Sequence, residues 1–295
     1  MKKVLDAMLA ALARGERVLL QDVSFSLSSG ERMAVIGETG SGKTMLALSI
    51  LGLLPANVRM QGGCIQMDGA VLPAGRRLQT LCGDKLVYIP QNGAEFLLPT
   101  RTVRKQLYDS LKKLGLPRKD LPALAAEKLR LAGFDAPETV LDKYPFQLSG
   151  GMARRVLVST ALITDAQLII ADEPTPGMSL DQALEALKMF REMADEGKAV
   201  ILITHDIDLA FEFADRVAVF YAGTTVETAP AADFKAGPDA LRHPYSKALW
   251  RALPQNGFQP IEGFQPYAGR LPKGCLFAPR CPYKTEECEK EVPPV

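Results

Sequence analysis

The sequence lacks an excess of charge of either sign. Its 295 residues include 35 lysines and arginines against 34 aspartates and glutamates, so the formal net charge is only +1. Nucleic acids attract proteins through concentrated basic surfaces. Because the charges balance, we expect no nucleic acid among the partners of this chain.

Long apolar runs are also missing. The longest candidate, Met45–Leu54, has about half of the ~20 residues that a membrane-spanning helix needs. The N-terminus combines lysines with an apolar stretch, as a signal peptide does, but no clean small-x-small cleavage site precedes Arg14. We expect a cytoplasmic protein that reaches any membrane by docking to another protein.

Cysteine is too scarce for a disulfide framework. The chain has five cysteines, an odd number, and structural disulfides are rare in cytosolic proteins. Cys64 and Cys82 are isolated and are interpreted as small core or loop residues. Cys275, Cys281 and Cys288 follow the spacing C-x5-C-x6-C. Thiolates at such spacing suit zinc or an iron–sulfur cluster, and reduced thiols in a proline-rich tail are the alternative.

Strand and helix patterns alternate along most of the chain, which predicts an α/β fold with a largely parallel sheet. A helix is expected at residues 44–54, helical hairpins at 102–135, and a separate C-terminal extension after about residue 229, where proline, glycine and aromatic residues become frequent. Short apolar runs predict buried strands at residues 32–36, 85–89, 168–171, 199–204 and 216–220.

A phosphate-binding motif lies between the first of these strands and the first helix. The segment fits G-x-x-x-x-G-K-[ST] without departure. Backbone N–H groups of such a loop wrap a triphosphate, while the lysine neutralises its charge and the hydroxyl of the last residue ligates Mg²⁺. The candidate ATP-binding residues are Gly37, Glu38, Thr39, Gly40, Ser41, Gly42, Lys43 and Thr44.

An acidic pair follows the apolar run at 168–171. Ligands of open parallel sheets bind at the carboxyl ends of the strands, where this pair would lie. Asp172 is the candidate Mg²⁺ ligand, and Glu173 the candidate catalytic base that polarises the attacking water. An ordinary helix N-cap is the alternative interpretation of such a pair.

The segment Leu148–Met152 is Leu-Ser-Gly-Gly-Met and resembles the signature of ABC ATPases. The resemblance covers roughly residues 18–228. It implies a RecA-like core with a helical signature subdomain, in which Ser149, Gly150 and Gly151 cap ATP held by a second ATPase subunit. It also implies a catalytic and Mg²⁺-contacting role for Gln91 and a catalytic switch role for His205.

Within that family the sequence is most similar to the oligopeptide, dipeptide and nickel permease group. Three segments carry this resemblance: Tyr144–Met152, His243–Leu249 and the cysteine-bearing tail from Cys275 to Cys288. In this group a tail with a fourth cysteine can hold a [4Fe–4S] cluster. No fourth cysteine follows Cys288 in this sequence.

Several positions depart from the family pattern. Members hold adenine with an aromatic residue near the position of Ala11–Gly15, which contains none here, and Arg14 is the candidate substitute through a cation–π contact. The N-terminal segment favours a helix where the family has a strand. Asp181 follows Glu173 at a spacing two residues longer than usual for the nucleotide-contacting D-loop aspartate, and Arg154 replaces a common glutamine.

The resemblance implies a motor subunit that hydrolyses ATP for a multi-subunit importer of peptides or nickel. Its partners would be a second ATPase, identical or related, two transmembrane permeases and, indirectly, a solute-binding protein, on the cytoplasmic face of the inner membrane. A weakly catalytic regulatory cassette and a non-transport ABC ATPase are the alternatives. The expected domains are a core at 1–92 and 160–228, a helical subdomain at 93–159 and an extension at 229–295.

Overall fold

The computed structural model describes residues 2–72, 85–91, 93–176, 178–268 and 270–292. Its contacts divide the chain into two compact units, each described here by itself. The first unit comprises Met1–Ser28, Arg32–Gln79 and Leu202–Val295, and the second comprises Ser29–Glu31 and Thr80–Ile201. Cys82 lies outside the described residues. No described helix combines the length and hydrophobicity that a bilayer crossing requires.

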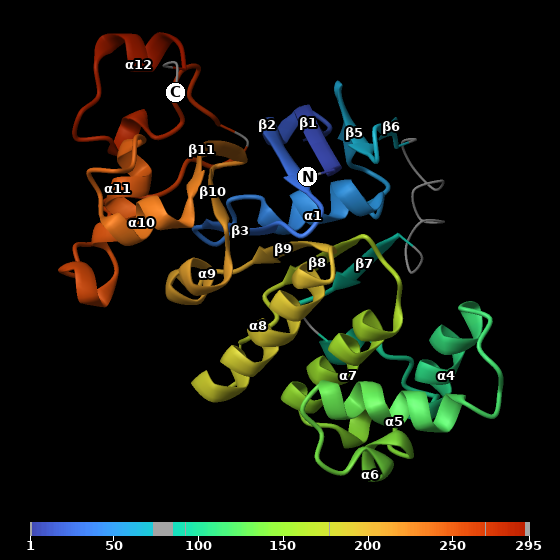
Figure 1. Ribbon diagram of the computed structural model, residues 1–295. Helices are drawn as coiled ribbons and strands as arrows, with labels where there is room; N and C mark the ends of the chain where they lie inside the picture. Colours follow the sequence, from blue (N-terminus) through green and yellow to red (C-terminus); the bar gives the residue numbers. More distant parts are fainter. Residues whose placement is uncertain (1, 73–84, 92, 177, 269, 293–295) are drawn as a thin grey trace. The chain divides into compact units, whose positions relative to one another are not determined.

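An antiparallel sheet of the first unit is built on a long hairpin of β1 (Lys3–Arg14) and β2 (Arg17–Ser28). Strands β5 (Gly63–Met67) and β6 (Ala70–Val71) continue the sheet in the order β2-β1-β5-β6, and β4 (Arg59–Met60) also pairs with β1. Figure 1 shows these strands beside helix α1. Cys64 is half-buried in β5.

The prediction of a helix at the N-terminus is wrong. Residues 3–14 are rich in alanine, leucine and methionine, which favour helices, but such propensities amount to a few tenths of a kcal/mol per residue. Here β1 bonds to β2 on one edge and to β5 on the other. It also buries Leu5, Leu9 and Leu12 almost completely. Backbone pairing and burial therefore decide the strand.

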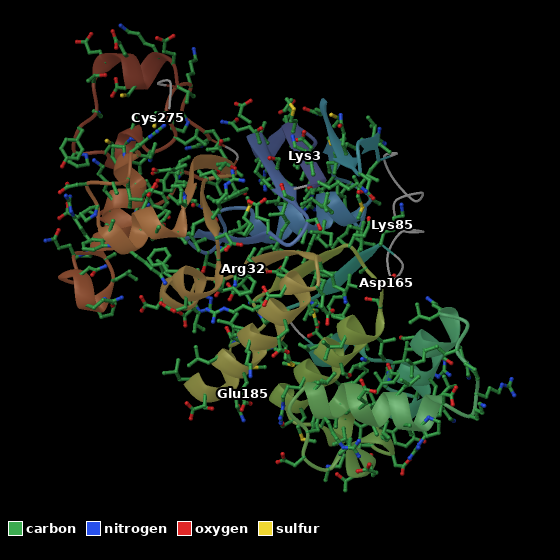
Figure 2. All side chains as sticks on the ribbon, viewed as in Figure 1. Lys3, Arg32, Lys85, Asp165, Glu185 and Cys275 are labelled. Atoms are coloured by element: carbon green, nitrogen blue, oxygen red, sulfur yellow. The ribbon has the colours of Figure 1, made fainter. Side chains whose placement is uncertain are left out.

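The phosphate-loop side of the first unit is a parallel pair, β3 (Arg32–Gly37) and β10 (Arg216–Tyr221). Strand β11 (Thr224–Pro230) turns back antiparallel to β10. Arg32 begins β3 (Figure 2) and forms an ion pair of 2.6 Å with Asp215, which directly precedes β10. The pKa of Asp215 is held below its usual range: burial opposes this shift, but hydrogen bonds and charge from Arg32 outweigh it.

Short helices follow these strands in the first unit. α1 (Lys43–Leu51) ends at Leu51, three residues earlier than the predicted limit of 54, because its C-cap Gly52 adopts a left-handed conformation with φ 65°. Helix α9 (Ile207–Phe213) follows strand β9 (Ala199–Ile203) along the chain. The C-terminal extension carries α10 (Ala231–Ala236), α11 (Pro244–Arg251) and α12 (Glu286–Lys290).

The second unit contains the parallel strands β7 (Leu86–Ile89) and β8 (Leu168–Asp172), followed along the chain by α8 (Leu180–Asp195). Strand β9 (Ala199–Ile203) begins in this unit, and its last residues belong to the first. All residues of β8 and β9 are buried. The strands predicted at 32–36, 85–89, 168–171, 199–204 and 216–220 are all confirmed to within one residue at each end.

A cluster of helices completes the second unit (Figure 1). α4 (Val103–Lys113) and α5 (Leu121–Leu131) confirm the predicted hairpin, and α7 (Gly150–Ile163) packs against them. Short helices α3 (Gly93–Phe96) and α6 (Pro137–Leu141) border them. The cluster has an apolar core of its own, which includes Val103, Leu107, Leu129, Ala153 and Val156.

Candidate functional site

The phosphate loop, residues 37–44, connects the buried strand β3 to helix α1. Gly42 is the N-cap of α1, with φ 101°, and Lys43 is the first helical residue. The Ser41 N–H donates to the Glu38 carbonyl oxygen at 3.1 Å, so the loop curls back on itself. A loop of this shape at the start of a helix directs backbone N–H groups and the positive end of the helix dipole toward an anion.

Polar groups inside the loop are arranged around the same space. The Lys43 side chain is 8% exposed, and its Nζ donates to the carbonyl oxygens of Gly37 at 2.9 Å and Glu38 at 3.0 Å. Ser41 is fully buried, and its Oγ has no hydrogen-bond partner within the described structure. Thr44 is exposed. A buried ammonium and an unsatisfied hydroxyl fit a triphosphate ligand, and an exposed hydroxyl fits Mg²⁺.

Two loop positions favour glycine, Gly37 through close packing against backbone and both Gly37 and Gly42 through a positive φ. A Cβ on Gly37 would lie 2.1 Å from the Phe220 carbonyl oxygen of β10. A Cβ on Gly42 would lie 2.5 Å from Leu20 Cδ2 of β2. Both glycines have positive φ, at 148° and 101°. The loop is thus held between β10 and β2, while Thr39 and Gly40 at its tip are exposed.

His205 belongs to the same unit as the phosphate loop and follows β9. The N–H of the preceding Thr204 donates to the Val35 carbonyl oxygen of β3 at 3.2 Å. Val35 is two residues before Gly37, so His205 and the loop leave neighbouring segments at the same end. Asp206 then caps α9 by accepting from the Leu209 N–H at 3.0 Å. His205 is exposed.

The second unit brings the acidic pair to the carboxyl end of β8. Asp172 is 1% exposed and accepts a hydrogen bond from the Tyr88 hydroxyl, with 3.1 Å between Oδ2 and the phenol oxygen. Burial, and then the charge of Asp172, raise the pKa of Tyr88 above its usual range, so Tyr88 stays a hydrogen-bond donor. Glu173 is 7% exposed and has φ 48°. Such backbone strain outside glycine is concentrated at functional sites.

Gln91 leaves the neighbouring strand at the same end of this sheet. In the parallel register of β7 and β8, Ile89 lies opposite Ala171, so Gln91 emerges beside Asp172 and Glu173. The Gln91 side chain is exposed. Within the second unit the structure therefore brings Gln91 and the acidic pair together, as the sequence predicts.

The signature turn begins helix α7. Ser149 is the N-cap of α7, and its Oγ accepts from the Met152 N–H at 3.3 Å. Ser149 and Gly150 are exposed, and a Cβ on Gly150 or Gly151 would meet open space. A cavity of about 380 Å³ adjoins this turn and is also lined by Pro176, Met178 and Gln182. A hydroxyl, bare backbone and a helix N-terminus thus face outward.

Asp181 lies in the first turn of α8 and is exposed. Ser179 precedes that helix as its N-cap, in a capping box with Gln182. Between Glu173 and this cap, the Met178 N–H donates to the Thr175 carbonyl oxygen at 3.1 Å and forms a turn. The extra residues after Glu173 are therefore accommodated in a turn before α8 begins.

Comparisons with known proteins agree with this geometry. A family model described as ABC transporter matches residues 20–176. The chain belongs to the ABC transporter family. A second model, described as the C-terminal region of oligopeptide/dipeptide transporters, matches residues 226–288 of this ABC ATPase.

Relatives of this chain and solved structures of other proteins support the same family and fold. The Dipeptide transport ATP-binding protein DppD of Haemophilus influenzae is 35% identical over 280 residues, which cover 92% of this chain and 84% of the relative. The Oligopeptide transport ATP-binding protein AppD of Bacillus subtilis is 34% identical over 286 residues, covering 92% and 85%. The dimeric cassette MJ0796 bound to ADP and Pi has a TM-score of 0.69 at 23% identity, covering 77% of this chain and 98% of that one, and shows the shared fold.

Two further residues of this ABC ATPase contact predicted site residues, although the sequence alone assigned no role to either. Tyr88 donates to Asp172, and its position in a strand three residues before Gln91 is the only signal in the sequence. Arg154 of α7 donates to the carbonyl oxygens of Gln91, at 2.9 Å, and of Pro176. Arg154 therefore ties the signature helix to the backbone that follows β7 and β8.

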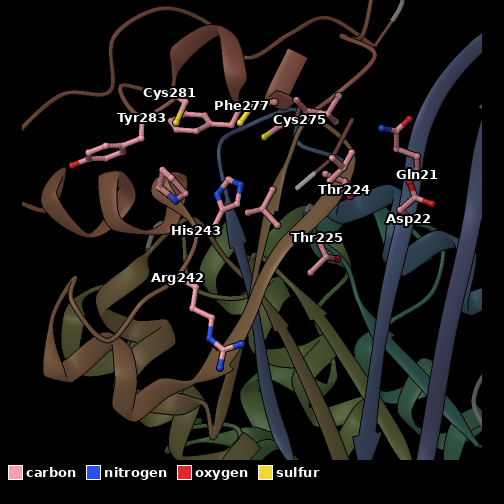
Figure 3. A pocket seen from close by; sticks show the side chains of 15 residues that line it. Gln21, Asp22, Thr224, Thr225, Arg242, His243, Cys275, Phe277, Cys281 and Tyr283 are labelled. Carbon is pink, nitrogen blue, oxygen red and sulfur yellow. The ribbon is translucent and has the colours of Figure 1, made fainter. Parts of the chain in front are cut away.

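The C-terminal region of the ABC ATPase holds a cavity of about 550 Å³. Figure 3 shows His243 and Phe277 facing it together with the sulfur atoms of Cys275 and Cys281, while Asp22 of β2 lies on the other side. Cys288 also lines the cavity, and the Cys275 N–H donates to the Cys288 carbonyl oxygen at 2.8 Å. The tail thus closes over the cavity with its three cysteines.

The geometry does not support the iron–sulfur interpretation of Cys275, Cys281 and Cys288. In the ranges that the structure describes, no three His, Cys, Asp or Glu side chains converge as a metal-binding group. All three thiols are free and half-buried. Their environments differ: burial raises the pKa of the Cys281 thiol, whereas the hydrogen bond between Cys288 and Thr285 lowers the pKa of the Cys288 thiol.

His243 is a structural residue of the extension. Its Nδ1 accepts from the Tyr245 N–H at 3.1 Å and so caps α11. The buried carboxylate of Glu227 accepts from the backbone N–H groups of Arg242, at 2.8 Å, and of His243, at 3.0 Å. Burial lowers the pKa of His243 to about 4, although the charge of Glu227 opposes this shift. His243 is therefore neutral near pH 7 and serves as a cap.

Proposed function

We propose that this ABC ATPase is the motor subunit of a membrane importer for di- or oligopeptides. The observation that carries the proposal is the outward-facing Ser149–Gly151 turn in a chain that also has a complete phosphate loop. The relatives named for dipeptide and oligopeptide transport, 34–35% identical over most of the chain, favour a peptide as cargo.

In this proposal the first unit binds the triphosphate. The loop amides from Gly37 to Gly42 wrap the phosphates, and Lys43 neutralises the negative charge of the β- and γ-phosphates. Mg²⁺, when bound, would be held by the Thr44 hydroxyl and would offset the charge that develops on the phosphate oxygens. His205, on the same side of its unit as the loop, contacts the terminal phosphate during hydrolysis.

The second unit supplies the hydrolytic groups. Asp172 accepts from Tyr88 through Oδ2, and its carboxylate and the Gln91 side chain would be the Mg²⁺ ligands that this unit contributes. Glu173 orients the attacking water and accepts its proton. The left-handed backbone conformation of Glu173 changes the direction of the chain directly after β8. Arg154 is a positioning residue that fixes the backbone on which Gln91 lies.

A second ATPase subunit, identical or related, completes each ATP site. The Ser149 hydroxyl and the Gly150 and Gly151 amides of one subunit cap the γ-phosphate held by its partner, and Asp181 contacts the same nucleotide from the D-loop. ATP then stabilises the closed dimer by mass action. The helical region 93–159 and the segment after Gln91 transmit closure to two permease subunits at the cytoplasmic face of the membrane. A solute-binding protein delivers the peptide to these permeases.

The test compares three variants of the purified full-length protein. Glu173→Gln should still bind ATP and form ATP-dependent dimers, but should hydrolyse ATP at least about 100-fold more slowly, the usual contribution of a positioned base. Lys43→Ala should lose ATP binding. Glu185→Gln is the control, because Glu185 is an exposed residue of α8 outside the proposed site.

Unchanged hydrolysis by Glu173→Gln, or unchanged ATP affinity in Lys43→Ala, would contradict the assigned roles. The same assay on the isolated subunit and on the assembled transporter separates a motor from a weakly catalytic regulatory cassette. A motor should gain activity on assembly and lose it in Glu173→Gln, whereas a regulatory cassette should leave the activity of the complex unchanged when Glu173 is replaced.

A further inference from the structure

Residues 264–267 of the C-terminal extension lie against the phosphate loop. The Gln265 side chain accepts from the Ala222 N–H, with 3.1 Å between Oε1 and the nitrogen. Its Nε2 lies 4.0 Å from the place that a Cβ on Gly40 would occupy. Since Gly40 is at the exposed tip of the loop, this segment of the extension borders the opening through which a phosphate ligand must enter.

The turn between β10 and β11 joins this segment to the loop and to β2. The Gly223 N–H donates to the Ser41 carbonyl oxygen at 2.9 Å, and the Gly223 carbonyl oxygen accepts from the Gln21 N–H at 2.8 Å. Ala222, next to it, holds Gln265. The extension, the phosphate loop and β2 are therefore connected through two consecutive residues.

An aromatic ring and a guanidinium face each other beside this junction. The Arg17 guanidinium, at the start of β2, lies 5.2 Å from the centre of the Tyr267 ring. Tyr267 is 60% exposed, so a large part of its ring remains open to a ligand. The Arg270 N–H donates to the Tyr267 carbonyl oxygen at 2.8 Å, which holds Tyr267 in a turn. The pair thus forms a fixed, partly open aromatic surface beside the loop.

We propose that Tyr267 and Arg17 form the platform on which the adenine of ATP stacks, an inference that rests on the proposed function. A nucleotide whose phosphates occupy the loop must extend its base over the surface next to the loop. Two segments border the loop there: β2 contributes Arg17, and the extension contributes Tyr267. Aromatic rings and arginine planes bind a base by stacking and cation–π attraction, without requiring hydrogen bonds.

Arg14, the candidate base contact in the sequence, is engaged elsewhere. It lies opposite Arg17 in the hairpin register, at the end of β1. With the Asn57 amide oriented so that its oxygen faces the guanidinium, Arg14 Nε lies 2.9 Å from that oxygen. The aromatic residue that is missing from Ala11–Gly15 is thus supplied from a position about 250 residues later in the chain, and Arg17 holds it.

The test measures calorimetric affinities of the full-length protein for MgATP and for magnesium tripolyphosphate, which has the phosphates without the base. Tyr267→Ala should weaken MgATP binding about tenfold, the loss expected for one base–aromatic stack, and should leave tripolyphosphate binding unchanged within about twofold. Tyr267→Phe should keep the affinity for MgATP. Phe264→Ala is the matched control, because Phe264 is an exposed ring of the same segment.

The outcomes distinguish the platform from the proposed function. Equal weakening of both ligands in Tyr267→Ala, no weakening of either, or loss of MgATP affinity in Phe264→Ala instead would overturn the platform alone. If the unmodified protein bound neither ligand, or bound both equally well after Lys43→Ala, the proposed function would fail, and the platform with it.

Discussion

The ion pair between Arg280 and Glu38 gives the sharpest quantitative prediction, because it connects the C-terminal extension to the phosphate loop. The Arg280 side chain is 5% exposed and donates to Glu38 Oε1 at 2.9 Å, to the Tyr221 hydroxyl at 3.3 Å, and to the carbonyl oxygens of Ile261 and Glu262 at 3.1 and 2.8 Å. Glu38 is 31% exposed. We predict the effect of replacing Arg280 by methionine, which keeps much of its length.

Each lost hydrogen bond to a neutral acceptor contributes about 1 kcal/mol. Removing one partner of a buried ion pair costs ~3–5 kcal/mol, but Glu38 is partly exposed and regains water, so about 1–2 kcal/mol is expected for the pair. The three hydrogen bonds and the ion pair together mean that Arg280→Met should lower the free energy of unfolding by about 4–5 kcal/mol. Glu38→Gln, which retains an acceptor, should lower it by about 1 kcal/mol.

The assay is urea unfolding of the two single variants and the double variant. If the two side chains interact, the double variant should be less destabilised than the sum of the single variants by about 1–2 kcal/mol. The control cycle uses Lys235 and Glu212, an exposed pair at 3.0 Å, whose coupling should stay below about 0.5 kcal/mol. Additive effects at Arg280 and Glu38, within about 0.3 kcal/mol, would refute the reasoning.

Two further predictions concern the loop and the extension. Gly37→Ala should lower the melting temperature by about 10 °C, and Gly40→Ala by about 4 °C. Both variants place alanine at a positive φ, but only the alanine at position 37 would bring its Cβ to 2.1 Å from a carbonyl oxygen. Equal shifts of the two variants in differential scanning fluorimetry would contradict this reasoning. Between pH 7.5 and 4, the protein should lose about 3 kcal/mol of stability through His243, whose pKa falls from its ordinary 6.5 to about 4 on folding. The unfolded chain then binds the extra proton, so stability decreases as pH falls through this window. His243→Asn keeps an N-cap acceptor and should remove this part of the pH dependence, and an unchanged dependence would refute it.

The local geometry of the candidate ATP site could be predicted from sequence because its parts are short segments. Residues 37–44 need a strand before them and a helix after them, and both are visible as apolar patterns within a few residues. Asp172 and Glu173 likewise follow a run of apolar residues that can only be buried. In each case the chemistry is fixed by a short segment, and the structure supplies the same neighbours that the spacing implies.

The N-terminal hairpin could not be predicted in the same way. Residues 3–14 have the composition of a helix, and nothing within the segment indicates that both edges of the backbone will be paired. The deciding partners are β2, which follows after a tight turn, and β5, about 55 residues later. Non-local pairing overrides local propensity, and a single sequence carries little signal for it.

The role of the extension was hidden for the same reason. Glu38 and Arg280 are 242 residues apart, and Glu38 occupies a loop position at which the phosphate motif accepts any residue. The Glu38 N–H also donates to the Tyr245 hydroxyl at 3.3 Å. The motif indicates what the loop binds. The residues that contact Glu38, the second residue of the loop, come from the C-terminal extension, which the sequence predicts to be separate.

These contacts mean that the extension and the phosphate loop respond to each other. Arg280 forms an ion pair with Glu38, and the Tyr245 hydroxyl accepts a hydrogen bond from the Glu38 N–H. Gln265 is hydrogen-bonded to Ala222, and the neighbouring Gly223 is hydrogen-bonded to Ser41. A shift of the extension must break these bonds or move the loop, because the loop is packed against backbone at Gly37 and has little freedom to adjust alone. A partner that shifts the extension on binding would therefore change the affinity for nucleotide, and nucleotide would change the affinity for that partner by the same factor.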